Sequence, residues 1–205
     1  MNKRGLSLKY TATAFALITL TGCANLQPIL PKNAPLETNS AYVAGTFSGE
    51  TYHGFAFVIQ SLDNHKKYYL SMSGNQFIGR QQDHLTTAIK IPAGRYTIKQ
   101  WLTYERLLRE VVVRKPVHEH PVLGKPFQLK AGDVLHLGSY DLDEKIERSY
   151  ASNTYFFFIK SELLTQQMVQ EQLSNAYPSL AQQPFSCLFC IDTIPELQKD
   201  GFKMP

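Results

Sequence analysis

Short runs of β-branched and aromatic residues, separated by turn residues, dominate the middle of the chain. From residue 41 onward these runs alternate with Gly, Pro, Asn and Asp, which is typical of strands joined by turns. Tyr96 and Ile98 alternate with Thr97 and Lys99, so one face of that strand should be buried. The pattern predicts nine strands, at 41–47, 53–60, 66–72, 85–91, 95–102, 107–113, 126–129, 134–140 and 154–160. Nine short strands predict a mainly β protein, an antiparallel sandwich or a barrel.

One segment near the end of the chain has a helical period instead. Residues 161–176 contain no Gly or Pro and begin with a Ser that can cap a helix, followed by a Glu in the first turn. Their apolar stripe consists of Leu164, Met168, Val169, Leu173, Ala176 and Tyr177. We expect one amphipathic helix that ends before Pro178 and packs on the β domain. A helix on a membrane surface is less favoured, because the polar side carries Gln and Glu rather than Lys and Arg.

Segments that carry prolines flank the predicted domain of residues 41–180. Residues 24–40 contain three prolines and no regular period, so we expect a flexible, semi-extended spacer of up to about 50 Å. Residues 181–205 lack a clear period and are predicted to form a partly disordered tail. The apolar residues of 185–197 are a candidate contact segment for a partner.

The start of the chain has the composition of an export signal. Residues 1–9 carry three positive charges, and the uncharged, mostly apolar run of residues 10–20 follows. A basic start, a short apolar middle and small residues before a cut are typical of a secretory signal peptide, here residues 1–22. The apolar run is shorter than the about 20 residues that a spanning helix needs.

Removal of this segment changes the charge of the protein. The whole chain has a net charge of +4, but three basic residues and no acidic one lie in residues 1–22, which leaves 18 basic and 17 acidic residues. Such a chain lacks the basic surface that nucleic-acid binding requires. We therefore expect no nucleic-acid partner.

The residues Leu20, Thr21, Gly22 and Cys23 resemble the lipobox of bacterial lipoproteins. The resemblance implies that the Cys23 thiol receives a diacylglyceryl group and becomes the first residue after cleavage. Two or three fatty chains would anchor the protein to a membrane permanently. In a Gram-negative host, Ala24 in place of Asp implies the outer membrane, facing the periplasm. The alternative is an ordinary secretory cut that leaves Cys23 as a plain thiol.

Two further cysteines, Cys187 and Cys190, are three positions apart. In an oxidising compartment this spacing favours a disulfide, either local or between chains. Thioredoxin-like activity would need the pair at the start of a helix that follows a strand. Soft-metal binding, for instance of Cu(I), would need more thiolate or thioether ligands nearby.

The sequence His118-Glu119-His120 lies between two prolines. An extended backbone would place both imidazoles on one side, where they could begin a Zn or Cu site with a third ligand from elsewhere. A solvated loop is the favoured interpretation. The chain lacks a Gly-x-Ser-x-Gly elbow and a phosphate-binding loop, and the aromatic run of residues 155–158 is interpreted as a fully buried strand rather than a ligand site.

Two segments, residues 91–98 (IPAGRYTI) and 127–138 (FQLKAGDVLHLG), together with a helix that ends at Tyr177-Pro178, resemble a family of small bacterial envelope lipoproteins of unknown function. The resemblance spans about residues 50–180. It implies an immunoglobulin-like or prealbumin-like β-sandwich and brings no catalytic residue.

These observations predict a non-enzymatic, lipid-anchored protein without a cofactor, whose β-sandwich binds or supports another envelope component at the outer membrane. The alternative is a metal-binding or thiol-redox protein that uses Cys187, Cys190, His118 and His120.

Overall fold

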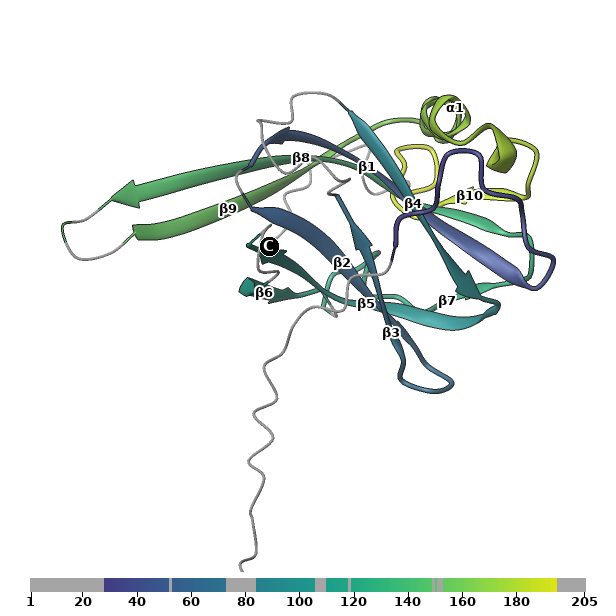
Figure 1. Ribbon diagram of the computed structural model, residues 1–205, viewed down its shortest axis with the longest axis horizontal. Helices are drawn as coiled ribbons and strands as arrows, with labels where there is room; N and C mark the ends of the chain where they lie inside the picture. Colours follow the sequence, from purple (N-terminus) through teal and green to yellow (C-terminus); the bar gives the residue numbers. More distant parts are fainter. Residues whose placement is uncertain are drawn as a thin grey trace, which may run out of the picture.

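Two β-sheets face each other and a single α-helix covers the outside of one of them (Figure 1). The computed structural model describes residues 28–51, 53–72, 84–105, 110–117, 119–148, 150 and 153–194. All nine predicted strands are found, with a short tenth strand near the C-terminus. The mainly β sandwich with one helix, predicted from the alternation of apolar and polar residues, is confirmed.

The first sheet has the order β10-β8-β1-β4, with β9 also paired to β8. Its strands are β1 (Ser40–Glu50), β4 (Leu85–Pro92), β8 (Val134–Arg148), β9 (Asn153–Glu162) and β10 (Phe185–Cys187). The expectation of a purely antiparallel sandwich is wrong for this sheet, because β8 runs parallel to both β1 and β10. Parallel neighbouring strands need a long connection. Between β1 and β8 the chain forms β2 to β7, and between β8 and β10 it forms β9 and the two helices.

The second sheet is antiparallel throughout, with the order β3-β2-β5-β6 and with β7 on β5. Its strands are β2 (Gly54–Ser61), β3 (Lys67–Ser71), β5 (Gly94–Tyr104), β6 (Val111–Pro116) and β7 (Phe127–Leu129). At the turn between β2 and β3, the Ser61 hydroxyl accepts the backbone N–H groups of Asp63 and Asn64, a side-chain contact typical of Ser in turns.

Aromatic rings from both sheets fill the space between them. The ring of Phe47 on β1 lies 6.3 Å from that of Phe57 on β2, and Phe57 lies 5.0 Å from Tyr140 on β8. Each fully buried Phe side chain contributes about 1.5–3 kcal/mol to folding. The interior of the sandwich is therefore a packed core.

The helix α1 (Gln166–Ala176) and the short 3-10 helix η1 (Pro178–Leu180) cover the outer face of the first sheet. The helix begins later than predicted, because Ser161 and Glu162 belong to β9. Thr165 is the N-cap, and its hydroxyl accepts the N–H of Met168. Val169 and Leu173 are buried, whereas Met168, expected on the apolar stripe, is exposed. None of the helices in the described residues is long and apolar enough to cross a membrane.

Both segments that flank the predicted domain are packed where the structure describes them. Leu30 is buried in the cluster beneath α1, and its N–H donates to the carbonyl oxygen of Ala88 on β4. Glu37 pairs with Lys90 on the same strand. Leu30 and Glu37 thus hold this segment on β4, although most of its other side chains are exposed, so it is not a free spacer. At the other end, residues 181–194 contain β10 and buried side chains, in contrast to the partly disordered tail expected there.

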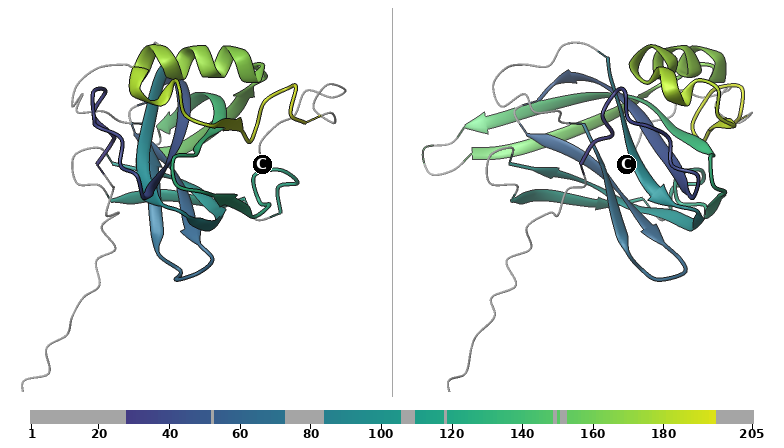
Figure 2. Two further views of the ribbon diagram at one scale, coloured as in Figure 1. Left: turned by 90° about the vertical axis from the view of Figure 1, so that its right-hand side faces the viewer. Right: turned by 45° about the vertical axis from the view of Figure 1, so that its right-hand side comes forward.

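The hairpin of β8 and β9 is much longer than its neighbours. Glu50, the last residue of β1, pairs with Asp143, so the hairpin continues beyond the sheet as a projecting arm, here defined as residues 143–148, 150 and 153–158. Figures 1 and 2 show the arm extending away from the body, at the end of the sandwich opposite α1. The expected strand of residues 134–140 is therefore only the first half of β8.

Candidate functional site

The cysteine pair lies inside the protein rather than on its surface. Cys187 and Cys190 form a disulfide, and both residues are buried, at 7% and 0% exposure. Cys187 pairs with His136 in the parallel β10-β8 ladder and packs near Val169 of α1. The pair follows a short strand and does not begin a helix, so it lacks the setting that stabilises a reactive thiolate.

The turn closed by this disulfide places Phe189 in the core. The Phe189 ring lies 6.4 Å from that of Tyr140 and 5.7 Å from that of His120. Gly138 makes room for it: its φ is +123°, and a Cβ there would lie 2.9 Å from the Phe189 carbonyl oxygen. The cysteine pair thus constrains a turn that closes one side of the sandwich, and the contact segment predicted at 185–197 is largely internal within the described residues.

His120 is the part of the predicted metal motif that the structure describes, since His118 lies outside the described residues. Its ring is buried, and Nδ1 accepts the backbone N–H groups of Val122 and Leu123. Burial lowers the pKa of His120. Among the described residues, no group of three or more His, Cys, Asp or Glu side chains could hold a metal ion. The solvated loop is nevertheless wrong for His120, which is 5% exposed.

A second histidine, His136, belongs to a buried polar network on the outer side of the first sheet. Its Nδ1 accepts the N–H of Gly138, so the proton of the neutral ring is on Nε2, which donates to the hydroxyl of Thr46 at 3.2 Å. The Thr46 hydroxyl in turn contacts that of Thr86 at 2.8 Å. Complete burial lowers the pKa of His136 to about 3. This imidazole is a neutral structural donor and not a metal ligand or a base.

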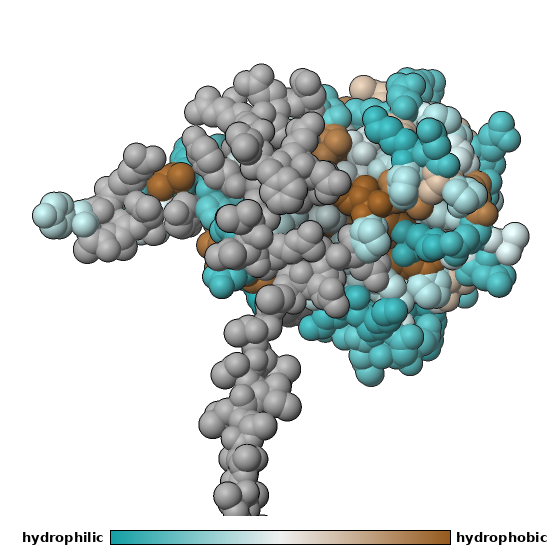
Figure 3. All heavy atoms as spheres, viewed as in Figure 1, coloured by the Kyte–Doolittle hydropathy of each residue, from teal (hydrophilic) through white to brown (hydrophobic). Residues whose placement is uncertain are grey.

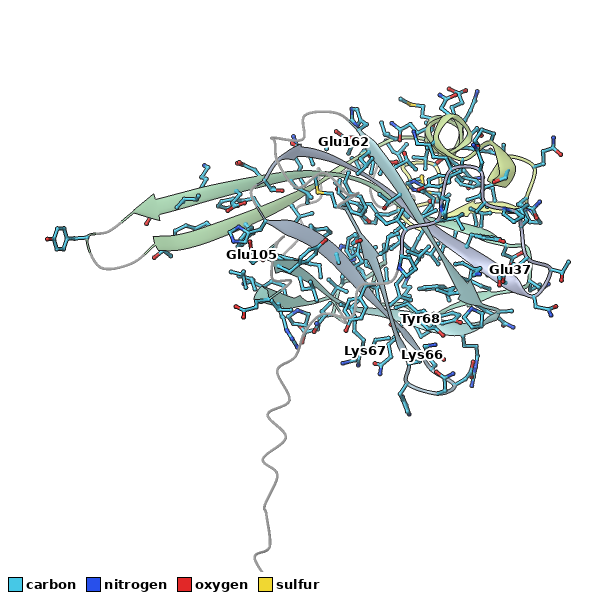
Figure 4. The ribbon with its side chains drawn as sticks, in the orientation of Figure 1. Glu37, Lys66, Lys67, Tyr68, Glu105 and Glu162 are labelled. Carbon is cyan, nitrogen blue, oxygen red and sulfur yellow. A yellow bond between two sulfur atoms is a disulfide. The ribbon has the colours of Figure 1, made fainter. Side chains whose placement is uncertain are left out.

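Polar residues continue across the outer face toward the arm. Glu162 on β9 accepts the hydroxyls of Ser139 at 2.6 Å and of Ser48 at 3.3 Å, and its Oε2 lies 3.5 Å from Nδ1 of His84. Figure 4 shows Glu162 on the upper, outer side of the first sheet. The single proton of the Ser48 hydroxyl is shared between Glu162 and Asp141, whose carboxylate oxygens both lie 3.3 Å away. The serine protons are directed at carboxylates instead of an imidazole, so these contacts join strands and do not form a Ser-His-acid triad.

A buried carboxylate fastens the root of the arm. Glu144 on β8 accepts the backbone N–H and the imidazole Nδ1–H of His53, and the ring of His53 meets Phe157 of β9 edge-on at 5.3 Å. A cavity of about 10 Å³ lies beside them, room for one water molecule. The hydroxyl of Thr103 lines this cavity and has no hydrogen-bond partner among the described residues.

The outer face of the arm presents aromatic side chains to solvent. Phe156 and Phe158 are 40% and 50% exposed, and the Lys145 ammonium lies 5.4 Å from the centre of the Phe158 ring. Hydrophobic atoms are visible on the arm, outside the body (Figure 3). The prediction of a fully buried strand at 155–158 is wrong. This part of β9 extends beyond the body of the protein, and only the face of the strand that carries Phe157 turns toward the body.

These arm residues are the candidate site that the sequence analysis missed. A usable signal is present in the sequence that precedes them: after Leu142, charged residues follow at Asp143, Glu144, Lys145 and Glu147. A strand so rich in charge has little core to face, and its hairpin partner is then solvated as well.

Comparisons with known proteins give no family and only weak structural similarity. The sequence matches no protein-family model and none of the curated proteins. A leucine-rich repeat protein from Bacteroides thetaiotaomicron is 13% identical, with 58% of this chain and 18% of that chain covered and a TM-score of 0.34. A structure described as a trapped toxin is 10% identical, with 60% and 24% covered and a TM-score of 0.15. The chain thus spans less than a quarter of either protein, and neither likeness carries a functional argument.

Proposed function

We propose that the protein is a lipid-anchored, non-enzymatic component of the outer membrane, facing the periplasm, whose β-sandwich binds or supports another envelope component. The observation that carries this proposal is the sequence Leu20-Thr21-Gly22-Cys23 at the end of the uncharged apolar run. Its resemblance to the lipobox, and that of the chain to small envelope lipoproteins, supports the proposed compartment.

The position of Leu30 supports an anchor close to the folded body. Leu30 is the first buried residue in the described part of the chain, seven positions after Cys23. Even fully extended, seven residues reach only about 25 Å. The body would then stay near the lipid surface, in place of the longer separation expected for a spacer of residues 24–40.

The arm supports a binding role for the body. The polar groups of Glu162, Glu144 and His136 are engaged in contacts that hold strands together, whereas Phe156 and Phe158 face solvent. Exposed aromatic side chains on a projecting element are typical of contact sites. The alternative, a metal-binding or thiol-redox protein, draws no similar support from Cys187 and Cys190, which are bonded and buried.

Mass spectrometry of the native N-terminus tests the proposal. We expect a chain that begins at Cys23 and carries a diacylglyceryl group, and a Cys23→Ser variant that leaves the membrane fraction. Cys187→Ser is the matched control and should stay membrane-bound. A native chain that retains Met1, or an unmodified Cys23, would contradict the anchor.

A further inference from the structure

The outer edge of β9 pairs with no other strand in the described part of the chain. β9 has ten residues, and β8 is its only partner among the described strands. Its opposite edge therefore presents a row of backbone N–H and C=O groups that no described strand satisfies. Such an edge is a template for strand addition.

The other sheet edges are short, charged or covered. The edge of β4 lies against the segment that contains Leu30, β10 has three residues, and β3 has five. On β6, the exposed positions include Arg114 and Lys115, and a proline ends the strand. Charge, proline, short length and coverage are the devices that keep sheet edges from pairing. Residues 153–159 of β9 carry no charged residue and no proline, and no described strand pairs with their outer edge.

The exposed face of β9 adds an apolar surface to this edge. Phe156 and Phe158 lie on either side of Phe157, which turns toward the body, and Lys160 is the only charged residue of β9 before Glu162. We propose that a second copy of the chain covers the edge, with the two β9 strands antiparallel and Phe157 at the two-fold axis.

The sequence of β9 is complementary to itself in this register. Phe156 of one copy lies opposite Phe158 of the second copy, and Thr154 lies opposite Lys160, so no like charges meet. Within each copy Lys145 is paired with Phe156, and Asp143 with Phe158. Each row across the four strands therefore contains Lys145 and Phe156 of one copy, followed by Phe158 and Asp143 of the second copy. The two phenylalanines form a cross-strand aromatic pair, which stabilises the sheet.

The symmetry of this pairing also fits a membrane anchor. A two-fold axis between antiparallel strands of one sheet stands perpendicular to the sheet, so the outer faces of the two first sheets point the same way. Leu30 packs on that outer face, beneath α1. Both N-terminal segments would thus emerge toward the same membrane. This agreement rests on the proposed anchor, whereas the pairing of the arms stands without it.

Cross-linking in the full mature protein, purified in detergent, tests the register. Copies that carry Thr154→Cys are mixed with copies that carry Lys160→Cys and are oxidised. Directly opposed Cβ atoms lie about 5 Å apart, so we expect a disulfide-linked dimer in the mixture. Neither variant alone should link, because equivalent positions are then six residues out of register. Linking in either single variant, or none in the mixture, would overturn the proposal.

The wild-type protein separates this proposal from the anchor. Cys187 and Cys190 are bonded to each other, so a linked wild-type dimer would arise from an unmodified Cys23 and would count against the anchor, not against the arms.

The mass of the assembly gives a second measurement. We expect two chains for the wild type and one for Phe156→Lys with Phe158→Lys, because four lysines would then meet at the axis. Val112→Lys is the matched control, an equally exposed residue on the edge strand β6, and should remain dimeric. A monomeric wild type, a dimeric double variant, or a link to a different protein would overturn the proposal.

Discussion

Glu144 accepts hydrogen bonds from both the backbone N–H and the imidazole Nδ1–H of His53, at 3.1 and 2.7 Å, while its own side chain is completely buried. The pair joins the connection between β1 and β2 to β8 at the point where the arm leaves the sheet. A buried carboxylate is expensive without its partners, so the two residues depend on each other.

Replacement of His53 should therefore destabilise the protein strongly. His53→Ala removes the imidazole donor to the buried Glu144 carboxylate and keeps the backbone N–H of residue 53 as a donor. We expect this change to lower the free energy of unfolding by about 3 kcal/mol. Urea unfolding measures it. His84→Ala is the matched control: that side chain is 54% exposed and contacts Glu162 at 3.5 Å, so its loss should cost about 0.5 kcal/mol or less. Equal effects of the two changes would contradict the role of Glu144.

His136 should make the protein sensitive to acid. Its pKa is near 6.5 when unfolded and about 3 when folded, because the neutral ring is completely buried. Below pH 6.5 the unfolded chain takes up a proton that the folded protein rejects, so falling pH favours unfolding, by about 1.4 kcal/mol for each pH unit. Above pH 6.5 the residue contributes no slope.

His136→Gln tests this slope, because Gln can still donate to Thr46 but does not titrate. We expect the variant to lose less stability between pH 6.5 and pH 4 than the wild type does, measured by urea unfolding at each pH. An unchanged slope in His136→Gln would mean that the folded protein accepts the proton.

Reduction of the Cys187–Cys190 disulfide should be slow in the native state and destabilising once complete. Both residues are buried, which denies access to a reductant. Opening a loop of four residues costs about 2 kcal/mol in the chain-entropy model. Thiol titration in the folded protein and in urea measures the rate and the extent. Fast, reversible reduction of the folded protein would revive the thiol-redox alternative.

Replacement by Ala should destabilise the protein more at Gly138 than at Gly132. Both have positive φ, but a Cβ at Gly138 meets Phe189 backbone at 2.9 Å, whereas at Gly132 it meets only the end of the Gln183 side chain at 3.4 Å. Gly132→Ala should cost about 1 kcal/mol of backbone strain, and Gly138→Ala about 3 kcal/mol or more. Similar losses in thermal unfolding would show that the Phe189 turn gives way easily.

The alternation along the chain was enough to find the strands and the class of fold. Period-two runs such as residues 95–102 are local, because each residue faces the core or the solvent according to its own position. The same locality explains the predictions for the export signal and for Cys23, which depend on short segments that no tertiary contact needs to assemble.

The sequence could not decide which strands are neighbours or how far each one extends. Whether β8 lies beside β1 in parallel depends on contacts between residues far apart in the chain, and the exposure of Phe156 and Phe158 depends on where β1 ends. Seen alone, residues 155–158 resemble a buried strand. The same limit applies to Leu30, which packs only because α1 and β4 form a surface for it.

Cys187 shows most clearly what the sequence predicts and what only the tertiary structure determines. Its spacing to Cys190 and the expected compartment were enough to favour a disulfide. Only the tertiary structure determined that the bond is internal and that its turn places Phe189 against Gly138, because burial is a property of the surrounding elements and not of the segment itself.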